Sequence, residues 1–222
     1  MIHKFKDRRE AGELLAKHLK ERYAGEKSVV VALPRGGLEV GLPIVEALQV
    51  PLKALVVRKL GAPQQPELAI GALASGGFIY LNKQLIESLQ VTEEELIDIK
   101  DRESRELLRR ENLLGTSGSA LEVKDTDVLI VDDGIATGAT IEVAIRAIKA
   151  GRPSSISIAV PVAPLQAIER LHRHVDHIYS LQRPIYMGAI GDFYESFPQV
   201  SDEHALQLLA VGNMSERRAD AG

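Results

Sequence analysis

Hydrophobic and polar residues alternate along this chain in a pattern that predicts helices and strands in turn. Between residues 7 and 23, apolar positions recur at helical spacing, which predicts an amphipathic helix. Farther along, short continuous apolar runs, typical of strands covered on both faces, precede segments with helical periodicity. We predict strands at 29–33, 52–57, 128–131, 156–160 and 177–180, and helices at 37–48, 139–150 and 165–172. This order is typical of a parallel sheet with helices on both faces.

Two stretches between the second and third of these strands have a different pattern. Residues 61–66 are rich in glycine, proline and glutamine, which predicts a loop. Residues 70–73 and 78–81 are apolar and flank the turn Ser75-Gly76-Gly77, which predicts a hairpin.

A long charged helix is predicted at 92–114. Thr92 and Glu95 have the spacing of a capping box, and acidic residues precede arginines by four positions along the segment. Its apolar residues are few, mainly Leu96, Ile99, Leu107 and Leu114. The helix is therefore either a solvated helix held by a narrow apolar seam, or a lid or dimer arm near a functional site.

Composition limits the classes of function. The 222 residues include 27 basic and 31 acidic ones, a mildly acidic balance that gives no support to a nucleic-acid or membrane-surface role. The absence of cysteine excludes disulfides, thiolate metal sites and a cysteine nucleophile. The first fifteen residues carry charges throughout and contain no apolar core of signal-peptide length. We expect a soluble, cytoplasmic protein that forms a homo-oligomer, in the simplest case a dimer.

The run at 128–140, VLIVDDGIATGAT, joins a buried strand to two carboxylates and a hydroxyl-lined turn. Asp132 and Asp133 directly follow the strand, at the sheet edge where open α/β sheets bind ligands. The residues after them can turn backbone N–H groups and hydroxyls toward an anion. A phosphate would bind in this turn, and a diol would bind the carboxylates. The structural alternative is a strand-to-helix loop in which an aspartate or threonine caps the helix.

This run resembles the phosphoribosyl pyrophosphate (PRPP) motif of type I phosphoribosyltransferases, which has four apolar residues, two acidic residues and a TG-x-T turn. The resemblance implies that Asp132 and Asp133 hold the ribose hydroxyls. It also implies that the 5′-phosphate binds in the turn of Gly134, Ile135, Ala136, Thr137, Gly138, Ala139 and Thr140. The implied fold is a single α/β domain over 1–222: a Rossmann-like, mostly parallel five-stranded sheet in a core at about 29–181, a helical insertion at about 83–114 and a hood at about 182–212.

A second candidate site is the turn Pro34-Arg35-Gly36-Gly37, which follows the first strand and opens a helix. Two glycines allow the backbone to approach a pyrophosphate, and Arg35 adds a positive charge. The family has a pyrophosphate-binding loop with a cis peptide at this point, so we expect a cis bond next to Arg35. By itself such a turn is more often a plain connection between strand and helix.

Arg58 and Lys59 end the second predicted strand and enter the 61–66 loop. In the family, a basic residue at this point contacts pyrophosphate, and the loop closes over the reacting centre to exclude water. The resemblance therefore implies pyrophosphate contacts for both residues and a catalytic role for Lys59. The alternative is ordinary surface charge.

Aromatic residues gather near the end of the chain, between 186 and 197. A planar base can stack on such rings, so Tyr186, Phe193 and Tyr194 are candidates for base stacking, and packing of the tail onto the domain is the alternative. The stretch also resembles the hood of purine-salvage enzymes, in which an aspartate at the position of Asp192 lies near Mg²⁺. We expect Mg²⁺ as the cofactor, bound mainly through PRPP itself.

The resemblance implies an Mg²⁺-dependent phosphoribosyltransferase of nucleotide salvage, which transfers the phosphoribosyl group of PRPP to a nitrogenous base and releases pyrophosphate. Asp132, Asp133, Arg35 and Lys59 are its predicted catalytic residues. Hypoxanthine-guanine enzymes have an aspartate just before the TG pair, where this chain has Ala136, so the acceptor stays open. A PRPP-binding regulator without turnover is the alternative function. His172, His174 and His177 could hold a metal, but an ordinary helix end is the simpler interpretation.

Overall fold

Five parallel strands form the main sheet, as predicted. The computed structural model describes residues 4–23, 27–116 and 121–219, and the strand order is β2-β1-β6-β7-β8. Every neighbouring pair is parallel. The strands are β1 (Ser28–Ala32), β2 (Leu52–Ala54), β6 (Asp127–Val131), β7 (Ser155–Val162) and β8 (His177–Gln182). Ala32 of β1 pairs with Val131 of β6, so the two strands end at the same edge of the sheet.

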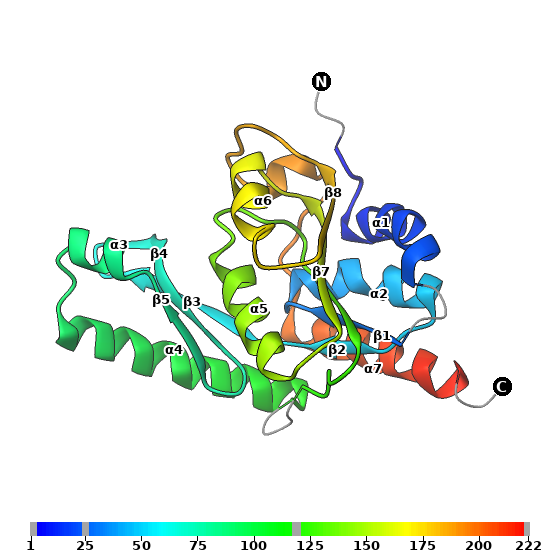
Figure 1. Cartoon of the computed structure of the whole chain (residues 1–222), viewed down its shortest axis with the longest axis horizontal. Coiled ribbons are helices and arrows are strands. Elements are labelled where there is room, and N and C mark those ends of the chain that lie inside the picture. Colours follow the sequence, from blue (N-terminus) through cyan, green and yellow to red (C-terminus); the bar gives the residue numbers. More distant parts are fainter. Residues whose placement is uncertain (1–3, 24–26, 117–120, 220–222) are drawn as a thin grey trace.

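Helices cover both faces of this sheet (Figure 1). The helices of this part of the chain are α1 (Arg8–Tyr23), α2 (Gly36–Leu48), α5 (Ala139–Ala150), α6 (Leu165–Leu171) and α7 (Asp202–Ala219). Along β1, Val30 packs in the apolar cluster that includes residues of α1, α2 and α7, whereas Val29 and Val31 pack in the cluster of α5 and α6. Both faces of the strand are therefore buried, which explains its continuous apolar sequence.

A second, antiparallel sheet of three strands projects from the main body as an arm, on the left of Figure 1. It contains β3 (Val57–Ala62), β4 (Gln65–Ala74) and β5 (Phe78–Leu81), followed by α3 (Lys83–Ser88) and α4 (Glu93–Leu114). The predicted hairpin of 70–73 and 78–81 is confirmed, since β4 and β5 pair across it. The arm, defined here as β3–β5 with α3 and α4, contains the whole predicted helical insertion.

The predictions for residues 52–66 are partly wrong. The predicted strand at 52–57 is split, because β2 ends at Ala54 and β3 begins at Val57 in the other sheet. Residues 61–66 form the turn end of the β3–β4 hairpin rather than a loop, because only residues 63 and 64 lie in the turn and the others lie in the two strands. Gly61 pairs with Ala69 across an irregular register, and a Cβ on Gly61 would lie 2.3 Å from the Pro66 carbonyl oxygen. The glycine therefore permits close strand pairing here and does not end the strand.

The long helix α4 begins at the predicted cap. Thr92 accepts a hydrogen bond from the Glu95 backbone N–H at 3.2 Å, and the Glu95 carboxylate accepts one from the Thr92 N–H at 2.9 Å. Ile99, Leu107 and Leu114 are buried, and so are Glu103 and Glu111. The apolar seam is thus as narrow as predicted, and carboxylates occupy part of the buried side.

The chain after β8 runs over the top of the body before it forms α7 (Figure 1). It includes the short 3₁₀ helix η1 (Ile190–Phe193). Phe193 and Tyr194 pack there against Phe5, which precedes α1. Helix α7 then packs against α2, and a Cβ on Gly212 would meet Leu52 of β2 at 2.6 Å. Of the helices that the structure describes, none has the combination of length and apolar character needed to cross a membrane.

Candidate active site

Two acidic residues stand at the carboxyl edge of the main sheet, directly after β6. Asp132 accepts a hydrogen bond on Oδ1 from the backbone N–H of Asp133 at 2.9 Å. The preceding residue, Val131, accepts one from the N–H of Leu33 at 2.9 Å, which ties the end of β1 to the end of β6. The sheet thus brings the two predicted ligand loops together, although they are about a hundred residues apart in the sequence.

The two-glycine turn lies directly on the acidic pair. A Cβ on Gly36 would lie 2.0 Å from Oδ2 of Asp133, and a Cβ on Gly37 would lie 2.7 Å from the Val131 carbonyl oxygen and 3.4 Å from Oδ1 of Asp132. Any side chain larger than hydrogen at Gly36 would displace the carboxylate. The peptide bond between Pro34 and Arg35 is cis, as the resemblance implied.

Arg8, in the first turn of α1, binds the carboxylate of Asp133. Its Nε donates to Oδ2 of Asp133 at 2.8 Å, and its Nη1 donates to the Pro198 carbonyl at 2.8 Å and to Glu39 at 3.4 Å. The guanidinium lies 3.7 Å above the centre of the Phe197 ring, and the residue is only 5% exposed. Arg8 therefore connects α1, the acidic pair and the segment after β8.

Arg8 is not among the residues predicted from the sequence. It stands in an Asp-Arg-Arg-Glu run whose other members are partly or fully exposed, and nothing in the spacing distinguishes it. A faint signal exists, because residues 8, 11, 12, 15, 16 and 19 share the buried side of α1. An arginine on the apolar side of an amphipathic helix is a candidate for a buried ion pair.

Burial raises the pKa of both aspartates. For Asp132 desolvation is the largest cause, and the neighbouring Asp133 charge raises its pKa further. Desolvation also raises the pKa of Asp133, but the Arg8 guanidinium opposes the shift. Tyr194 donates its hydroxyl to the Asp133 carbonyl at 2.7 Å, and burial raises the pKa of this phenol as well. Two carboxylates of raised pKa in one crevice are typical of a functional site.

The turn after the acidic pair leads into α5. The Ile135 N–H donates to the Val162 carbonyl at 2.8 Å, and Gly138, with φ of 77°, caps the helix that begins at Ala139. Because the first N–H groups of a helix have no partner within it, the start of α5 can bind an anion. The seven residues from Gly134 to Thr140 thus form one continuous turn and helix start, as the anion-binding interpretation requires.

The predicted cations lie in different surroundings. Arg35 Nη1 is 3.4 Å from Oδ1 of Asp202 at the start of α7. Arg58 Nη2 donates to Glu103 of α4 at 2.6 Å, and its Nε donates to the same oxygen at 3.0 Å. Arg58 thus joins β3 to α4 in this structure. Lys59 lies next to it on β3, opposite Ala72 of β4.

Of the three base-stacking candidates, one is open to solvent. Tyr186 is 91% exposed, whereas Phe193 and Tyr194 are 2% and 3% exposed. The Tyr194 ring stacks on Phe197, with centroids 4.8 Å apart. Neither buried ring offers a face to a base in this conformation. The packing alternative therefore describes Phe193 and Tyr194 better.

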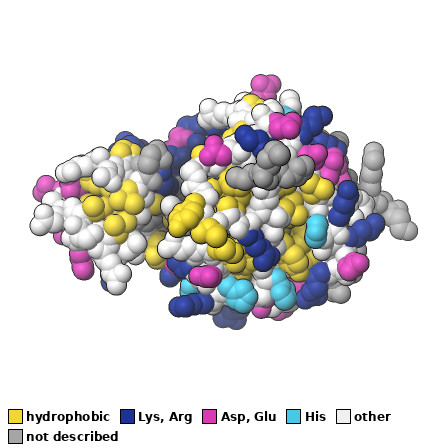
Figure 2. Space-filling model, turned by 90° about the horizontal axis from the view of Figure 1, so that it is seen from above, with side chains coloured by type: hydrophobic (Ala, Val, Ile, Leu, Met, Phe, Trp, Pro, Cys, Tyr) yellow, Lys and Arg dark blue, Asp and Glu magenta, His cyan; other side chains and the backbone are white. Residues whose placement is uncertain are grey.

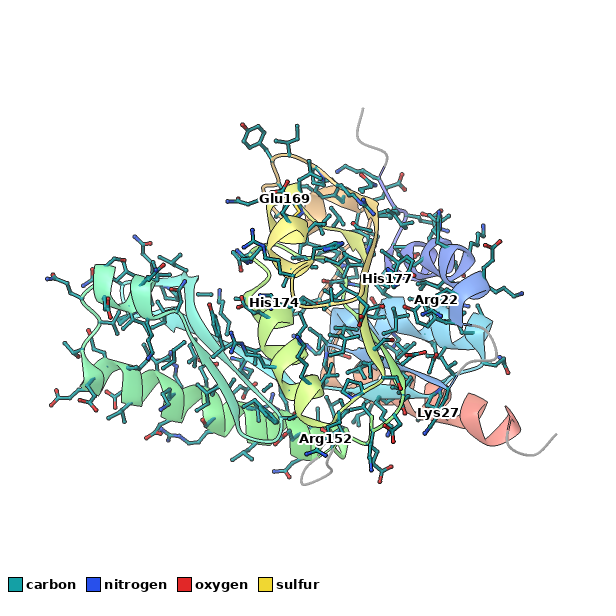
Figure 3. The ribbon with its side chains drawn as sticks, viewed as in Figure 1. Arg22, Lys27, Arg152, Glu169, His174 and His177 are labelled. Carbon is teal, nitrogen blue, oxygen red and sulfur yellow. The ribbon has the colours of Figure 1, made fainter. Side chains whose placement is uncertain are left out.

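Possible metal ligands are few. The Asp192 carboxylate accepts a hydrogen bond from the Ala189 N–H at 3.0 Å and caps η1. Within the described ranges, no group of three or more histidine, aspartate or glutamate side chains could hold a metal ion. This includes the histidines at 172–177, of which His174 lies before β8 and His177 begins it (Figure 3). His172 follows the last residue of α6, as the helix-end interpretation predicts, whereas His177 belongs to β8.

Known proteins resemble this chain over most of its length. A family model that describes the phosphoribosyl transferase domain matches residues 3–193. A Mycobacterium tuberculosis protein with the name "putative phosphoribosyl transferase" is 35% identical over 205 residues, which are 92% of this chain and 46% of that protein. The chain therefore spans about half the length of the curated relatives that it matches over most of its length.

Two further comparisons cover a shorter stretch and a solved structure. The uracil phosphoribosyltransferase of Mycoplasma genitalium is 42% identical over 73 residues, 32% of each chain. The crystal structure of the protein TT1426 from Thermus thermophilus is 35% identical and matches with a TM-score of 0.77. That match covers 93% of this chain and 97% of the other.

Proposed function

The chain belongs to the phosphoribosyl transferase domain family, and we propose that it transfers the phosphoribosyl group of PRPP to a nitrogenous base. In this reaction the acceptor nitrogen forms a bond to the anomeric carbon as the bond from that carbon to pyrophosphate breaks. An acceptor that carries an N–H proton releases it to solvent, a pyridine acceptor becomes a pyridinium, and pyrophosphate leaves with the bonding electron pair. The family and the α/β fold with its five-stranded parallel sheet support this reaction class.

One observation carries the proposal: the acidic pair lies directly under the two-glycine turn. A Cβ on Gly36 would lie 2.0 Å from Oδ2 of Asp133, so the turn fits against this carboxylate only because Gly36 has no side chain. A ligand bound to the turn would therefore lie close to the acidic pair. A ligand that spans the two must bear hydroxyls on one side and an anion on the other. PRPP has a ribose diol next to its pyrophosphate, and its 5′-phosphate would reach the start of α5.

Catalysis in this proposal is mainly electrostatic. Arg35 and Lys59 stabilise the negative charge that develops on the leaving pyrophosphate. Asp132 and Asp133 orient the ribose through its hydroxyls and favour positive charge on the ring. Arg8 does not touch the substrate in this scheme, and its ion pair with Asp133 orients that carboxylate and opposes the rise in its pKa that burial causes.

The donor set fits Mg²⁺ that is bound mainly through the substrate. Mg²⁺ typically takes one or two carboxylates together with substrate phosphates. The described residues offer the Asp132–Asp133 pair and no larger ligand cluster. When bound, Mg²⁺ would neutralise charge on the pyrophosphate. Asp132 and Asp133 are the residues that could approach the ion, and Asp192 is a weaker candidate because its carboxylate already caps η1.

Pyrophosphate release tests the proposal. Purified protein is incubated with PRPP and Mg²⁺ and a panel of purine, pyrimidine and pyridine acceptors, while calorimetry measures PRPP binding. We expect release that depends on one acceptor. In the variant Asp132→Asn/Asp133→Asn, PRPP binding should be lost, whereas the control Asp98→Asn/Asp101→Asn on the exposed side of α4 should bind normally.

Two results would contradict the transferase. Tight PRPP binding without release for any acceptor would favour the PRPP-binding regulator instead. Absence of PRPP binding in the folded wild-type protein would contradict the assignment of the site itself.

A further inference from the structure

A cavity of about 430 Å³ lies beside the turn that precedes α5. Its volume is within the range of small-molecule sites. The lining residues come from three segments that are separate in sequence: the turn, α6 and the chain after β8. They include Ala136, Thr137, Gln166, Arg170, Tyr186 and Met187. The cavity thus borders the proposed phosphate-binding turn.

Arg170 is the single charged side chain among the described residues that line this cavity. Its Nη2 donates a hydrogen bond to the Thr137 carbonyl, and no carboxylate in the described part of the chain pairs with it. A Cβ on Gly138 would lie 2.8 Å from the same Nη2 atom, so the guanidinium is close to the turn. Because a guanidinium has five N–H donors, most of its donors are left for a ligand.

Other lining residues of the cavity are aromatic or apolar. Tyr186 is 91% exposed and the preceding Ile185 is 70% exposed, although both are large hydrophobic residues. Both belong to the chain after β8, and this segment runs over the top of the body in Figure 1. Figure 2 views the molecule from above and shows apolar side chains on the body. An exposed ring beside a lone guanidinium suits a flat ligand that carries a negative charge.

We propose that Arg170 selects an acceptor whose ring carries a carboxylate, with the ring against Tyr186. This inference rests on the proposed function, since it assigns the acceptor class of the same site. Ala136 has no acid or base, and no carboxylate among the described residues lines the cavity, so nothing there repels an anion. A planar carboxylate ligand would satisfy the unused donors of the guanidinium in a bidentate pair.

Paired acceptors test this inference. Orotate and uracil share a ring, and only orotate carries a carboxylate on it. Nicotinate and nicotinamide also share a ring, and nicotinate carries a carboxylate where nicotinamide carries a carboxamide. Binding of all four is measured by calorimetry on the protein with PRPP and Mg²⁺, and turnover is measured with the same four. In at least one pair, the wild-type protein should prefer the carboxylate. If neither carboxylate is preferred, the inference is wrong.

The variant Arg170→Gln keeps hydrogen-bonding capacity and removes the charge. We expect its affinity and kcat/KM for the preferred carboxylate to fall about tenfold to a hundredfold, the range for hydrogen bonds to charged groups. Its affinity for the uncharged partner should change little. The control Arg173→Gln should match the wild-type protein, because Arg173 follows three residues later and lines a different cavity.

The readouts separate the possible failures. If Arg170→Gln weakens PRPP binding and leaves the preference between paired acceptors intact, Arg170 serves the 5′-phosphate and the acceptor inference is overturned. If no acceptor gives pyrophosphate release, the proposed transferase fails. The binding preference then still decides whether Arg170 recognises a carboxylate.

Discussion

At the scale of single residues, the site depends on close packing around Asp133. Its carboxylate contacts the Gly36 backbone on one side and the Arg8 guanidinium on the other. Arg8 in turn is held by the Pro198 carbonyl and the Phe197 ring. Contacts on several sides therefore fix the position of this carboxylate. Adding a methyl group at Gly36 should displace the carboxylate and the groups that contact it.

The substitution Gly36→Ala should disturb the site. The new Cβ would lie 2.0 Å from Oδ2 of Asp133, so either the carboxylate or the turn must move. We expect PRPP affinity to fall at least about tenfold and the free energy of unfolding to fall by about 1–3 kcal/mol, as for other overpacked sites. Calorimetry and urea unfolding measure the two effects.

Gly41→Ala is the matched control for this substitution. A Cβ on Gly41, in the same helix α2, would meet its nearest neighbours at ordinary distances of 3.4–3.6 Å. Alanine is favoured over glycine within a helix by roughly 0.5–1 kcal/mol, so this variant should be as stable as the wild-type protein or slightly more stable. Equal effects of the two substitutions would contradict the close packing inferred at Gly36.

The raised pKa of Asp132 predicts a stability effect that grows with pH. A carboxyl whose pKa is higher in the folded state stabilises the protein at low pH, and this contribution is lost as pH rises through the raised pKa. Asp132→Asn removes the buried charge and can keep the hydrogen bond from the Asp133 N–H. The variant's Tm should therefore exceed the wild-type Tm near pH 8, with a gain that shrinks toward pH 4.

Thermal unfolding of the ligand-free protein across this pH range measures the effect. The exposed variant Asp98→Asn should show no such trend. A Tm gain for Asp132→Asn that is independent of pH would mean that ionisation of this carboxyl is not its cause. If the Asp132→Asn variant is more stable than the wild-type protein but no longer binds PRPP, the carboxylate of Asp132 lowers stability and is needed for function.

At the scale of elements, charged contacts as well as the narrow apolar seam hold α4 against β3 within the arm. Arg58 of β3 and Glu103 of α4 form a hydrogen-bonded ion pair, and the Glu103 side chain is only 12% exposed. On the outer side of the helix, Glu106 binds Arg109 and Arg110, and these hydrogen bonds lower the pKa of Glu106 to about 2. The buried pair should matter more for stability than the exposed one.

Glu103→Gln should loosen α4 against β3. It leaves Arg58 without its carboxylate, at a cost of about 1–3 kcal/mol for a largely buried charged hydrogen bond. We expect faster amide hydrogen exchange in α4 and the β3–β4 hairpin, with little change in the main sheet. The same substitution at Glu106, whose side chain is 30% exposed, should change exchange by much less. Equal effects would show that burial of the Glu103 pair is unimportant.

Most elements could be predicted from the sequence because their signals are local. The central strands β1, β6 and β7 are short apolar runs buried on both faces, and α4 begins at a capping box that needs only Thr92 and Glu95. The split at Leu55 and Val56 was missed because both are buried apolar residues that continue the pattern of β2. The chain changes sheets there without any change in hydrophobicity.

The candidate site could be predicted only in part. The two ligand loops are visible because glycine, aspartate and threonine follow apolar strands. The residues that bind these loops come from elsewhere. Arg8, which binds the Asp133 carboxylate, lies 125 residues before it, and Arg170, which binds the Thr137 backbone carbonyl, lies 33 residues after it. Without the fold, only a faint helical periodicity distinguishes Arg8 from the surface arginines of α1, and nothing distinguishes Arg170 from the nearby Arg173. Long-range pairing of charges therefore needs the structure.

At the scale of the whole molecule, the proposed PRPP site gathers segments from most of the body. The turn after β1, the acidic pair after β6 and the start of α5 meet at one edge of the main sheet, and the chain after β8 contacts Asp133 through Tyr194. The arm joins this body next to the site, because β3 follows β2 with two residues between them. A ligand that contacts all these segments binds only the folded body and must therefore stabilise it.

PRPP with Mg²⁺ should raise the free energy of unfolding by about 2.7 kcal/mol at a hundred times its Kd. For a protein of this size, this corresponds to an increase in Tm of roughly 5–10 °C. Thermal unfolding at increasing PRPP concentration measures it. Hydrogen exchange with and without PRPP should show the added protection in β1, β6 and α5, with less in the distal half of α4.

The variant Asp132→Asn/Asp133→Asn separates this site from any other anion site on the protein. The two neutral amides of the variant replace the carboxylates that would accept hydrogen bonds from the ribose hydroxyls. The helix start at α5 and the cations Arg35 and Lys59 are unchanged. An anion held only by those groups would stabilise the variant as much as the wild-type protein. Loss of the Tm increase in the variant would show that PRPP binding depends on the contact between the ribose diol and the two aspartates. An undiminished increase would mean that PRPP binds elsewhere, which would contradict the proposed site.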